Sequence, residues 1–216
     1  MTTERVYGGL PRLERRERRR QRLLEAALDA IGEGGLKGLS LRSVCARAGL
    51  TSRYFYESFR DLDELLVALF DRVADEVTGA TLDAVAQAPW DALARAHAGL
   101  EAAIHVITDD HRKAKLLLIS GSGPESLQRR RREQLVQVAT VMSKLTRDFY
   151  GADRVTPTDA RLTTITFAAG YVELLHEWLS GSLPVSRTRL VDHMARIFVA
   201  SATVHSGRAA APPPSE

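Results

Sequence analysis

The sequence lacks several features that would place it in a particular class. Its single cysteine, Cys45, cannot form a disulfide within the chain, which indicates a reducing, cytoplasmic location. No apolar run approaches the ~20 residues of a membrane-spanning helix, and no apolar stretch with a cleavage site follows the basic N-terminus. Aromatic residues make up only 6%, whereas hydrophobic residues reach 44% and charged residues 26%. We therefore expect a soluble globular protein that does not bind membranes.

Signatures of catalysis are also missing. The chain has no glycine-rich phosphate loop, no Gly-x-Ser-x-Gly sequence and no paired cysteines. His105 and Asp109, four residues apart and near His111, have the spacing of metal ligands, but such residues far more often form a polar helix end. Cys45 falls on the inward side of an expected helix, which favours core packing over a redox switch. The sequence predicts a protein that is not an enzyme and needs no metal or cofactor.

The charge is distributed unevenly along the chain. The net charge is +3 overall, but residues 1–60 carry +6 and the remainder carries −3. A basic N-terminal part suits a polyanion such as nucleic acid, although basic segments also serve solubility.

Hydrophobic residues recur at helical spacing through most of the chain, and no segment alternates like a strand. The fold class is therefore expected to be all-α, with about nine helices. Residues 1–11 are expected to be a flexible arm and residues 206–216 a disordered tail. Capping residues, glycines and prolines place the helices at 12–34, 41–48, 51–59, 61–88, 89–108, 110–119, 125–150, 157–180 and 186–205, with a bend expected at Gly79.

Two short helices separated by Gly49 follow the first long helix, which is the arrangement of a helix-turn-helix unit. In the second short helix, Phe55 and Phe59 lie four residues apart and are expected to face the core. Arg53 and Tyr54 then point the opposite way, and both suit contact with DNA because arginine pairs with guanine edges and tyrosine reaches phosphates or thymine methyls.

Residues 34–65 resemble the DNA-binding domain of the TetR family of transcriptional regulators. The shared pattern is a glycine-containing loop, a Ser or Thr, a short helix, an Ala-Gly-hydrophobic turn, a Tyr, a Phe three residues later and a closing Leu. These positions are here Gly38, Ser40, Val44, Ala48-Gly49-Leu50, Tyr56, Phe59 and Leu65.

Two positions depart from the family pattern. Leu62 stands where the family usually has a lysine that contacts the DNA backbone, and Arg60 is the neighbouring candidate for that contact. Arg53 stands where the family often has a glycine, so the recognition helix is bulkier. An operator sequence therefore cannot be transferred from a relative.

The resemblance implies a role for each matching position. Phosphate contacts are implied for Arg42, Tyr56 and Arg60, and base contacts for Thr51, Ser52, Arg53 and Tyr54. The alternative is that these side chains only solvate the surface. Glu57 could accept a hydrogen bond from cytosine, but such an acid more often only orients a neighbouring arginine. An arm toward the backbone or minor groove is implied for Arg15, Arg16, Arg18 and Arg19.

The family's architecture implies a DNA-binding domain over residues 12–65 and a ligand-binding and dimerisation domain over 66–205. Helix 157–180 is apolar on two sides, so one side is expected to face the chain's own core and the other a partner chain. A single large monomer core is the alternative. The predicted homodimer interface comprises Leu162, Ile165, Ala169, Val172, Leu190, Met194 and Ile197.

The helices between residues 89 and 150 are expected to enclose a pocket for a small apolar or aromatic effector. Plain core packing is the alternative for every pocket candidate. The basic run Arg129–Arg132 is expected to be a solvated helix face. The pocket candidates are Trp90, His97, Leu100, Ile104, His105, Leu117, Phe167, Tyr171 and Trp178.

The predicted function is a ligand-responsive repressor that a small molecule releases from a palindromic operator. A transcriptional activator, or an architectural DNA binder without ligand control, stays open as the alternative. The length of the helical part argues against the architectural binder, because dimerisation alone needs far less.

Overall fold

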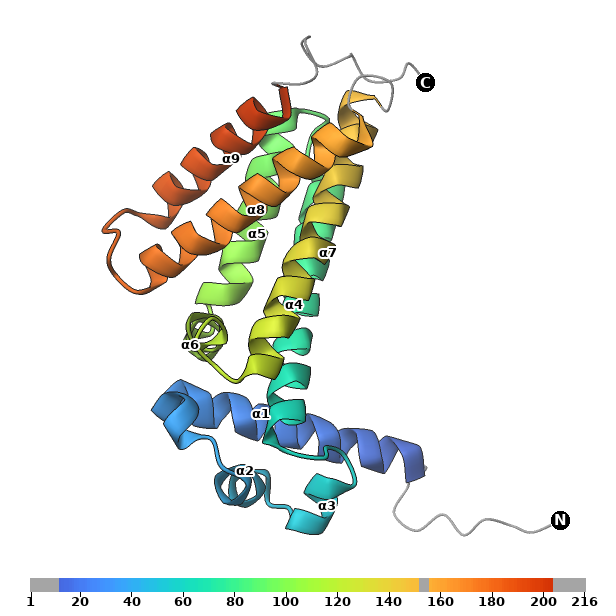
Figure 1. Ribbon diagram of the computed structural model, residues 1–216, viewed down its shortest axis with the longest axis vertical. Helices are drawn as coiled ribbons and strands as arrows, with labels where there is room; N and C mark the ends of the chain where they lie inside the picture. The colour runs from blue at the N-terminus through green and yellow to red at the C-terminus, as the bar shows by residue number, and fades with distance from the viewer. Residues whose placement is uncertain (1–11, 152–155, 204–216) are drawn as a thin grey trace, which may run out of the picture.

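The computed structural model describes residues 12–151 and 156–203, and over these residues it contains helices and no strands (Figure 1). The predicted all-α fold class is confirmed. The arm at residues 1–11 and the tail at 206–216 lie outside the described residues. The helices are α1 (Arg12–Gly38), α2 (Leu41–Ala48), α3 (Ser52–Tyr56), α4 (Leu62–Gln87), α5 (Ala92–Thr108), α6 (His111–Ser120), α7 (Glu125–Tyr150), α8 (Pro157–Leu179) and α9 (Arg187–Thr203).

Most predicted helix bounds agree with the structure to within a few residues, and the differences have local causes. The predicted helix 12–34 ends at a kink, because Gly35 adopts non-helical dihedral angles (φ 60°, ψ −153°), and a short helical segment then continues to Gly38. The predicted helix 51–59 is regular only over α3, because residues 57–59 continue as hydrogen-bonded turns. Helix α5 begins at Ala92 rather than near Pro89, because the Asp91 carboxylate caps its N-terminus. Helix α4 runs without interruption past Gly79, where the sequence predicts a bend.

Helices α1, α2 and α3 form a small unit at one end of the molecule (Figure 1). The apolar stripe of α1 is fully enclosed, with Leu24, Ala27, Leu28 and Ile31 all at most 2% exposed. Helices α2 and α3 pack their own apolar faces against this stripe. The 3.6-residue periodicity that predicted these helices therefore also identifies the core of this unit.

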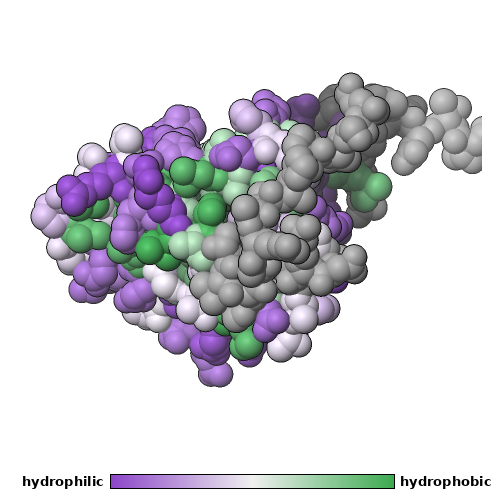
Figure 2. Space-filling view, turned by 90° about the horizontal axis from the view of Figure 1, so that it is seen from above, coloured by the Kyte–Doolittle hydropathy of each residue, from purple (hydrophilic) through white to green (hydrophobic). Residues whose placement is uncertain are grey.

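Helices α4, α5 and α7 stand roughly upright above α1, α8 and α9 run obliquely across the upper part, and α6 is seen nearly end-on (Figure 1). Helix α4 links the two parts. A second core lies between α5, α8 and α9, where Ile104, Ile107, Leu175 and Val191 are buried. Viewed from above, hydrophobic residues form separate patches among hydrophilic ones (Figure 2). Of the helices within the described ranges, none is both long and apolar enough to cross a membrane.

The N-terminal unit and the helices above it share one continuous core. Leu116 of α6 and Leu127 of α7 are both fully buried in the same cluster as Leu23 of α1 and Phe55 of α3. This cluster also extends along α4 as far as Val73. Because apolar side chains from both parts interlock, the position of α1 depends directly on α4, α6 and α7.

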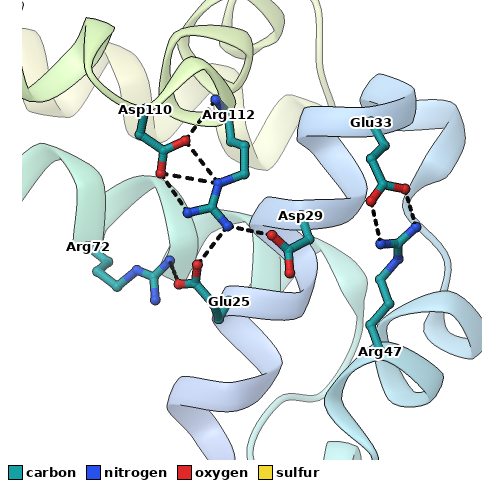
Figure 3. A network of polar contacts seen from close by, with 7 residues as sticks. All are labelled: Glu25, Asp29, Glu33, Arg47, Arg72, Asp110 and Arg112. Carbon is teal, nitrogen blue, oxygen red and sulfur yellow. Dashed lines mark hydrogen bonds and ion pairs between the residues drawn. The ribbon is translucent and has the colours of Figure 1, made fainter.

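A polar network reinforces the contact between α6 and α1 (Figure 3). Arg112 of α6 donates to Glu25 Oε1 at 2.7 Å and also to Asp29, both on α1. It donates as well to Asp110 Oδ2 at 2.6 Å, and this bond to Arg112 lowers the pKa of the Asp110 carboxyl below its usual value. Glu25 also accepts from Arg72 of α4 at 3.2 Å. One guanidinium thus joins three carboxylates and fixes α6 across α1.

Gly32 provides the space that this contact requires. A Cβ atom on Gly32 would lie 2.4 Å from Cγ of Arg112, which is closer than real Cβ contacts. The carbonyl of Gly32 also accepts a hydrogen bond from Lys115 Nζ. The backbone of α1 and the stems of two α6 side chains therefore meet directly.

We predict that Gly32→Ala lowers the free energy of unfolding by about 1–3 kcal/mol, because Arg112 must leave its place. This loss should exceed the gain of up to about 1 kcal/mol that alanine brings within a helix. Gly34→Ala is the matched control, since a Cβ there meets nothing within 4 Å. Urea unfolding of both variants measures the difference, and equal stabilities would contradict the role of Gly32.

Candidate nucleic-acid interface and cavity

Local capping sets the geometry of the helix-turn-helix. The Ser40 hydroxyl accepts from the Ser43 amide and the Ser43 hydroxyl accepts from the Ser40 amide, both at 3.1 Å, so α2 begins with a complete capping box. Gly49 ends α2 in the left-handed conformation, with φ of 59°, which glycine adopts without strain. The chain then turns sharply into α3.

The two faces of α3 differ as the sequence predicts. Phe55 is fully buried and Phe59, just beyond the helix, is 2% exposed, whereas Tyr56 is 61% exposed. The side chain of Arg53 is 85% exposed and points away from the core. Thr51 and Ser52 are exposed at the start of the helix, and the Thr51 side chain makes no capping bond.

A charged and aromatic group holds the outer face of α3 against α1. Arg19 of α1 lies over the ring of Tyr54, 4.5 Å from its centroid. Glu57 accepts from Arg19 Nη2 at 3.4 Å and from Arg53 Nε at 3.3 Å. The expectation that Glu57 orients a neighbouring arginine therefore agrees with the geometry, and Arg19 is part of a packed group rather than of a free arm.

Two further arginines of α1 hold the unit together, and sequence reasoning did not assign them this role. Arg20 lies 4.4 Å from the Phe59 ring centroid and donates to the Ser58 carbonyl at 3.4 Å. Arg22 donates to the carbonyl of Ala48 at the end of α2. The only sequence signal was the helical spacing that puts them on the side of α1 facing α2 and α3.

The other predicted DNA-contacting residues lie on the surface of the same unit. Arg42 at the start of α2 is exposed, as are Arg15, Arg16 and Arg18 on the first turns of α1. Arg60 is exposed and donates to Glu64 at 3.1 Å through its side chain and at 2.7 Å through its backbone amide. These bonds lower the pKa of Glu64 and hold Arg60 beside the start of α4.

A large apolar cavity of about 540 Å³ lies between α4, α5, α7 and α8. Four of the nine predicted pocket residues line it, namely Leu100, Leu117, Phe167 and Tyr171. Sequence reasoning missed much of the α7 wall, although its members recur every three or four residues and so share one face. These missed residues are Leu135, Val138, Met142, Leu145 and Phe149.

Five predicted pocket residues lie elsewhere. Ile104 is fully buried in the core between α5, α8 and α9, where Trp178 also packs and donates to the Val185 carbonyl at 2.9 Å. Trp90 is 46% exposed and stacks on Phe149 at 5.2 Å. Neither His97, which lies 3.9 Å from Asp192, nor His105 lines the cavity.

The metal-ligand spacing of His105 and Asp109 reflects a polar contact between these two residues at the end of α5. The Nε2 atom of His105 pairs with Asp109 at 2.8 Å and its Nδ1 lies 3.0 Å from Arg187 of α9. Within residues 12–151 and 156–203, no three His, Cys, Asp or Glu side chains gather in a way that could hold a metal ion.

The basic run on α7 is not simply a solvated face. Arg130 donates to Asp71 of α4 at 2.5 Å and to Glu133 at 3.2 Å, so it ties α7 to α4. Arg131 and Arg132 line the cavity. Only Arg129 is exposed and outside the cavity wall.

The predicted dimer-interface residues lie in three places, which are the chain's own core, the cavity wall and the outer surface of α8 and α9. Leu190 and Met194 are each 2% exposed and belong to the chain's own core, so they cannot reach a partner chain. Val172 lines the cavity. Ala169 also lines the cavity, although it is exposed. The other three lie on the outer surfaces of α8 and α9, where Leu162 is 59%, Ile165 37% and Ile197 51% exposed.

Comparison with known proteins points to one family for the N-terminal unit. Residues 23–69 match the model of the bacterial regulatory proteins of the tetR family, which describes regulators rather than enzymes. The HTH-type transcriptional regulator BetI of Burkholderia thailandensis is 39% identical over 72 residues. That alignment covers 33% of this chain and 37% of BetI, so the chain matches just over a third of the curated relative's length.

Solved structures share the fold along most of the chain. The fatty acid degradation regulator FadR from Bacillus halodurans superimposes with a TM-score of 0.71 at 16% identity, covering 84% of this chain and 94% of FadR. A putative transcriptional regulator from Pseudomonas aeruginosa PAO1 gives a TM-score of 0.67 at 20% identity, covering 88% and 93%. At these identities the likeness concerns the fold.

We predict that Ser40→Ala destabilises the protein by about 1 kcal/mol, because it removes the side-chain cap of α2. Thr51→Ala should cost clearly less, since that side chain caps nothing. Thermal unfolding followed by circular dichroism compares the two variants. A loss for Thr51→Ala as large as that for Ser40→Ala would contradict this account of the turn.

Proposed function

We propose that the chain is a regulator of the TetR family, because residues 23–69 match that family's model, and that it acts as a homodimeric, sequence-specific DNA-binding repressor that a small molecule releases from a palindromic operator. The observation that carries the proposal is the outer face of α3. Arg53 and Tyr56 extend into solvent there, from a helix that a buried core and α1 hold in place.

The recognition surface follows from this placement. Arg53, Tyr54, Thr51 and Ser52 are the proposed base-contacting residues, because they lie at the exposed start of α3. Phosphate contacts are proposed for Tyr56, Arg60 and Arg42, and for the arginines of the first turns of α1. Glu57 bonds to Arg53 and so limits the directions in which that guanidinium points.

A homodimer through α8 and α9 would double this surface. The two helices lie side by side in the upper part of the molecule, well away from α3 (Figure 1). Their outer faces carry Leu162, Ile165 and Ile197, three large apolar side chains that are 37–59% exposed. A two-fold pairing there would cover them and present two recognition helices to successive major grooves, about 34–36 Å apart.

The cavity and α1 are connected through α6. Leu117, Leu118 and Ser120 of α6 line the cavity, and Arg112 and Lys115 of the same helix bond to α1. An effector in the cavity that moves α6 would therefore shift α1 and change the separation of the recognition helices. A differential affinity of about 1.4 kcal/mol for the two arrangements is enough for tenfold release.

An activator, or an architectural binder without ligand control, is the alternative. The apolar cavity favours ligand control over the architectural binder, because its volume of about 540 Å³ falls within the range of small-molecule sites. Repression and activation differ in where the operator lies, which the chain itself does not determine.

We expect selection from random and genomic DNA to enrich a two-fold symmetric motif whose binding weakens steeply between 50 and 200 mM salt, by roughly 10³-fold or more for a dimer with several phosphate contacts. Arg53→Ala should relax preference at one base position in each half-site, by about 1–3 kcal/mol. Tyr56→Phe should weaken all sequences alike. Salt-sensitive binding without any enriched motif would contradict the proposal.

The proposed dimer contact on α8 can be tested by introducing negative charges into that face of the helix. We predict that Leu162→Glu with Ile165→Glu produces monomers in analytical ultracentrifugation, because two buried carboxylates per chain would face their symmetry mates. The matched control is Gln137→Glu with Thr140→Glu, which adds two negative charges at exposed positions of α7 that lie outside the cavity wall and the proposed interface. Dimers that persist in the variant with both α8 substitutions would place the interface elsewhere.

A further inference from the structure

Among the described residues, one enclosed polar atom that has no partner belongs to a side chain lining the cavity. The Tyr171 hydroxyl is enclosed, and among the described residues it has no hydrogen-bond partner. Tyr171 lines the cavity from α8, and its ring stacks on Phe167 at 6.2 Å, which holds its orientation. A buried hydroxyl without a hydrogen-bond partner is unfavourable, so a ligand acceptor that reaches it from the cavity would be stabilised.

The hydroxyl keeps its proton under physiological conditions. Burial raises the pKa of Tyr171 well above that of an ordinary phenol. It is therefore a hydrogen-bond donor that an apolar ligand could meet only with an oxygen or nitrogen acceptor.

The charges around the cavity are unbalanced in favour of cations. Arg95, Arg131 and Arg132 line it, against a single carboxylate, Glu173. Arg130, their neighbour on α7, is neutralised by Asp71 and Glu133. Within the described part of the chain, by contrast, neither Arg131, which is half-buried, nor Arg132, which is exposed, forms a salt bridge, so no carboxylate compensates their charges at the cavity wall.

From the Tyr171 hydroxyl and the arginines of the cavity wall, we propose that the effector is an apolar carboxylate. Its hydrocarbon part occupies the space between α4, α5, α7 and α8, Tyr171 donates to one of its oxygen atoms, and Arg131 compensates its charge. The inference rests on the proposed function, because it assigns a ligand class to the effector cavity. The volume of about 540 Å³ falls within the range of small-molecule sites.

The same features disfavour a cationic effector. A positively charged head would meet two uncompensated arginines, and an ammonium group cannot accept the hydrogen bond of Tyr171. A neutral alcohol would satisfy the hydroxyl but leave the arginines unpaired. The three head groups therefore rank as carboxylate, then alcohol, then amine.

Isothermal titration calorimetry with the full chain, in the absence of DNA, tests this ranking of head-group affinities. The probes are dodecanoate, dodecanol and dodecylamine below their aggregation limits, with naphthalene as an apolar probe that has no acceptor atom. Dodecanoate should bind at least tenfold more tightly than dodecylamine. Equal or tighter binding of the amine would overturn the proposal.

Substitutions at Tyr171 and at Arg131 test the two proposed ligand contacts separately. Tyr171→Phe should weaken dodecanoate binding about tenfold and leave naphthalene binding within twofold, which also shows that the cavity remains folded. Tyr150→Phe is its control, since Tyr150 lines the same cavity but its hydroxyl is not an enclosed unpartnered atom. Arg131→Gln should reduce the preference for dodecanoate over dodecanol, whereas Arg129→Gln should not, because Arg129 lies outside the cavity wall.

The outcomes distinguish this inference from the proposed function. Unchanged dodecanoate affinity in Tyr171→Phe, or binding of naphthalene alone, would overturn the carboxylate class and leave DNA binding untouched. Absence of binding by all four probes would overturn the inference and the effector cavity together. Tight dodecanoate binding without release of selected operator DNA would support the inference and contradict ligand control.

Discussion

The contact between α6 and α1 is the constraint on which the rest of the structure depends. Arg112 of α6 donates to Glu25 and Asp29 on α1 and also to Asp110, the N-cap residue of α6 (Figure 3). The absence of a side chain at Gly32 lets the Arg112 stem lie directly on the α1 backbone. Taken alone, such partly exposed ion pairs contribute little, but three carboxylates on one planar guanidinium fix both distance and orientation.

The apolar core makes this contact rigid. Leu116 and Leu127 lie in one cluster with the side chains that support α3, so that no layer of polar surface separates the N-terminal unit from the helices above it. A displacement of α6 is therefore transmitted to α1, because close-packed interiors change arrangement as units rather than deforming locally. The position of the recognition surface therefore depends on packing against helices that are remote from it in the sequence.

The surface of α3 and the cavity share one property, which is that neighbouring side chains already hold a polar group in place before a ligand binds. Arg19 and Glu57 restrict Tyr54 and Arg53 on α3, and stacking on Phe167 restricts the Tyr171 hydroxyl. Groups ordered in advance lose less conformational entropy when a ligand binds. Both sites lie on helices, which restrict their side chains more than loops do.

The sequence by itself determined the helices and the inner face of the helix-turn-helix, because caps, left-handed glycines and apolar periodicity act within a few residues of each other. Ser40, Gly49, Phe55 and Phe59 were all assigned correctly on that basis. Only the tertiary structure decided which partner each apolar face meets. Periodicity identifies a buried stripe but not its neighbour, so Leu190 and Met194 belong to the chain's own core and Ile104 lies outside the cavity. The role of Arg112 likewise depends on carboxylates more than eighty residues earlier in the chain, which no local pattern brings together.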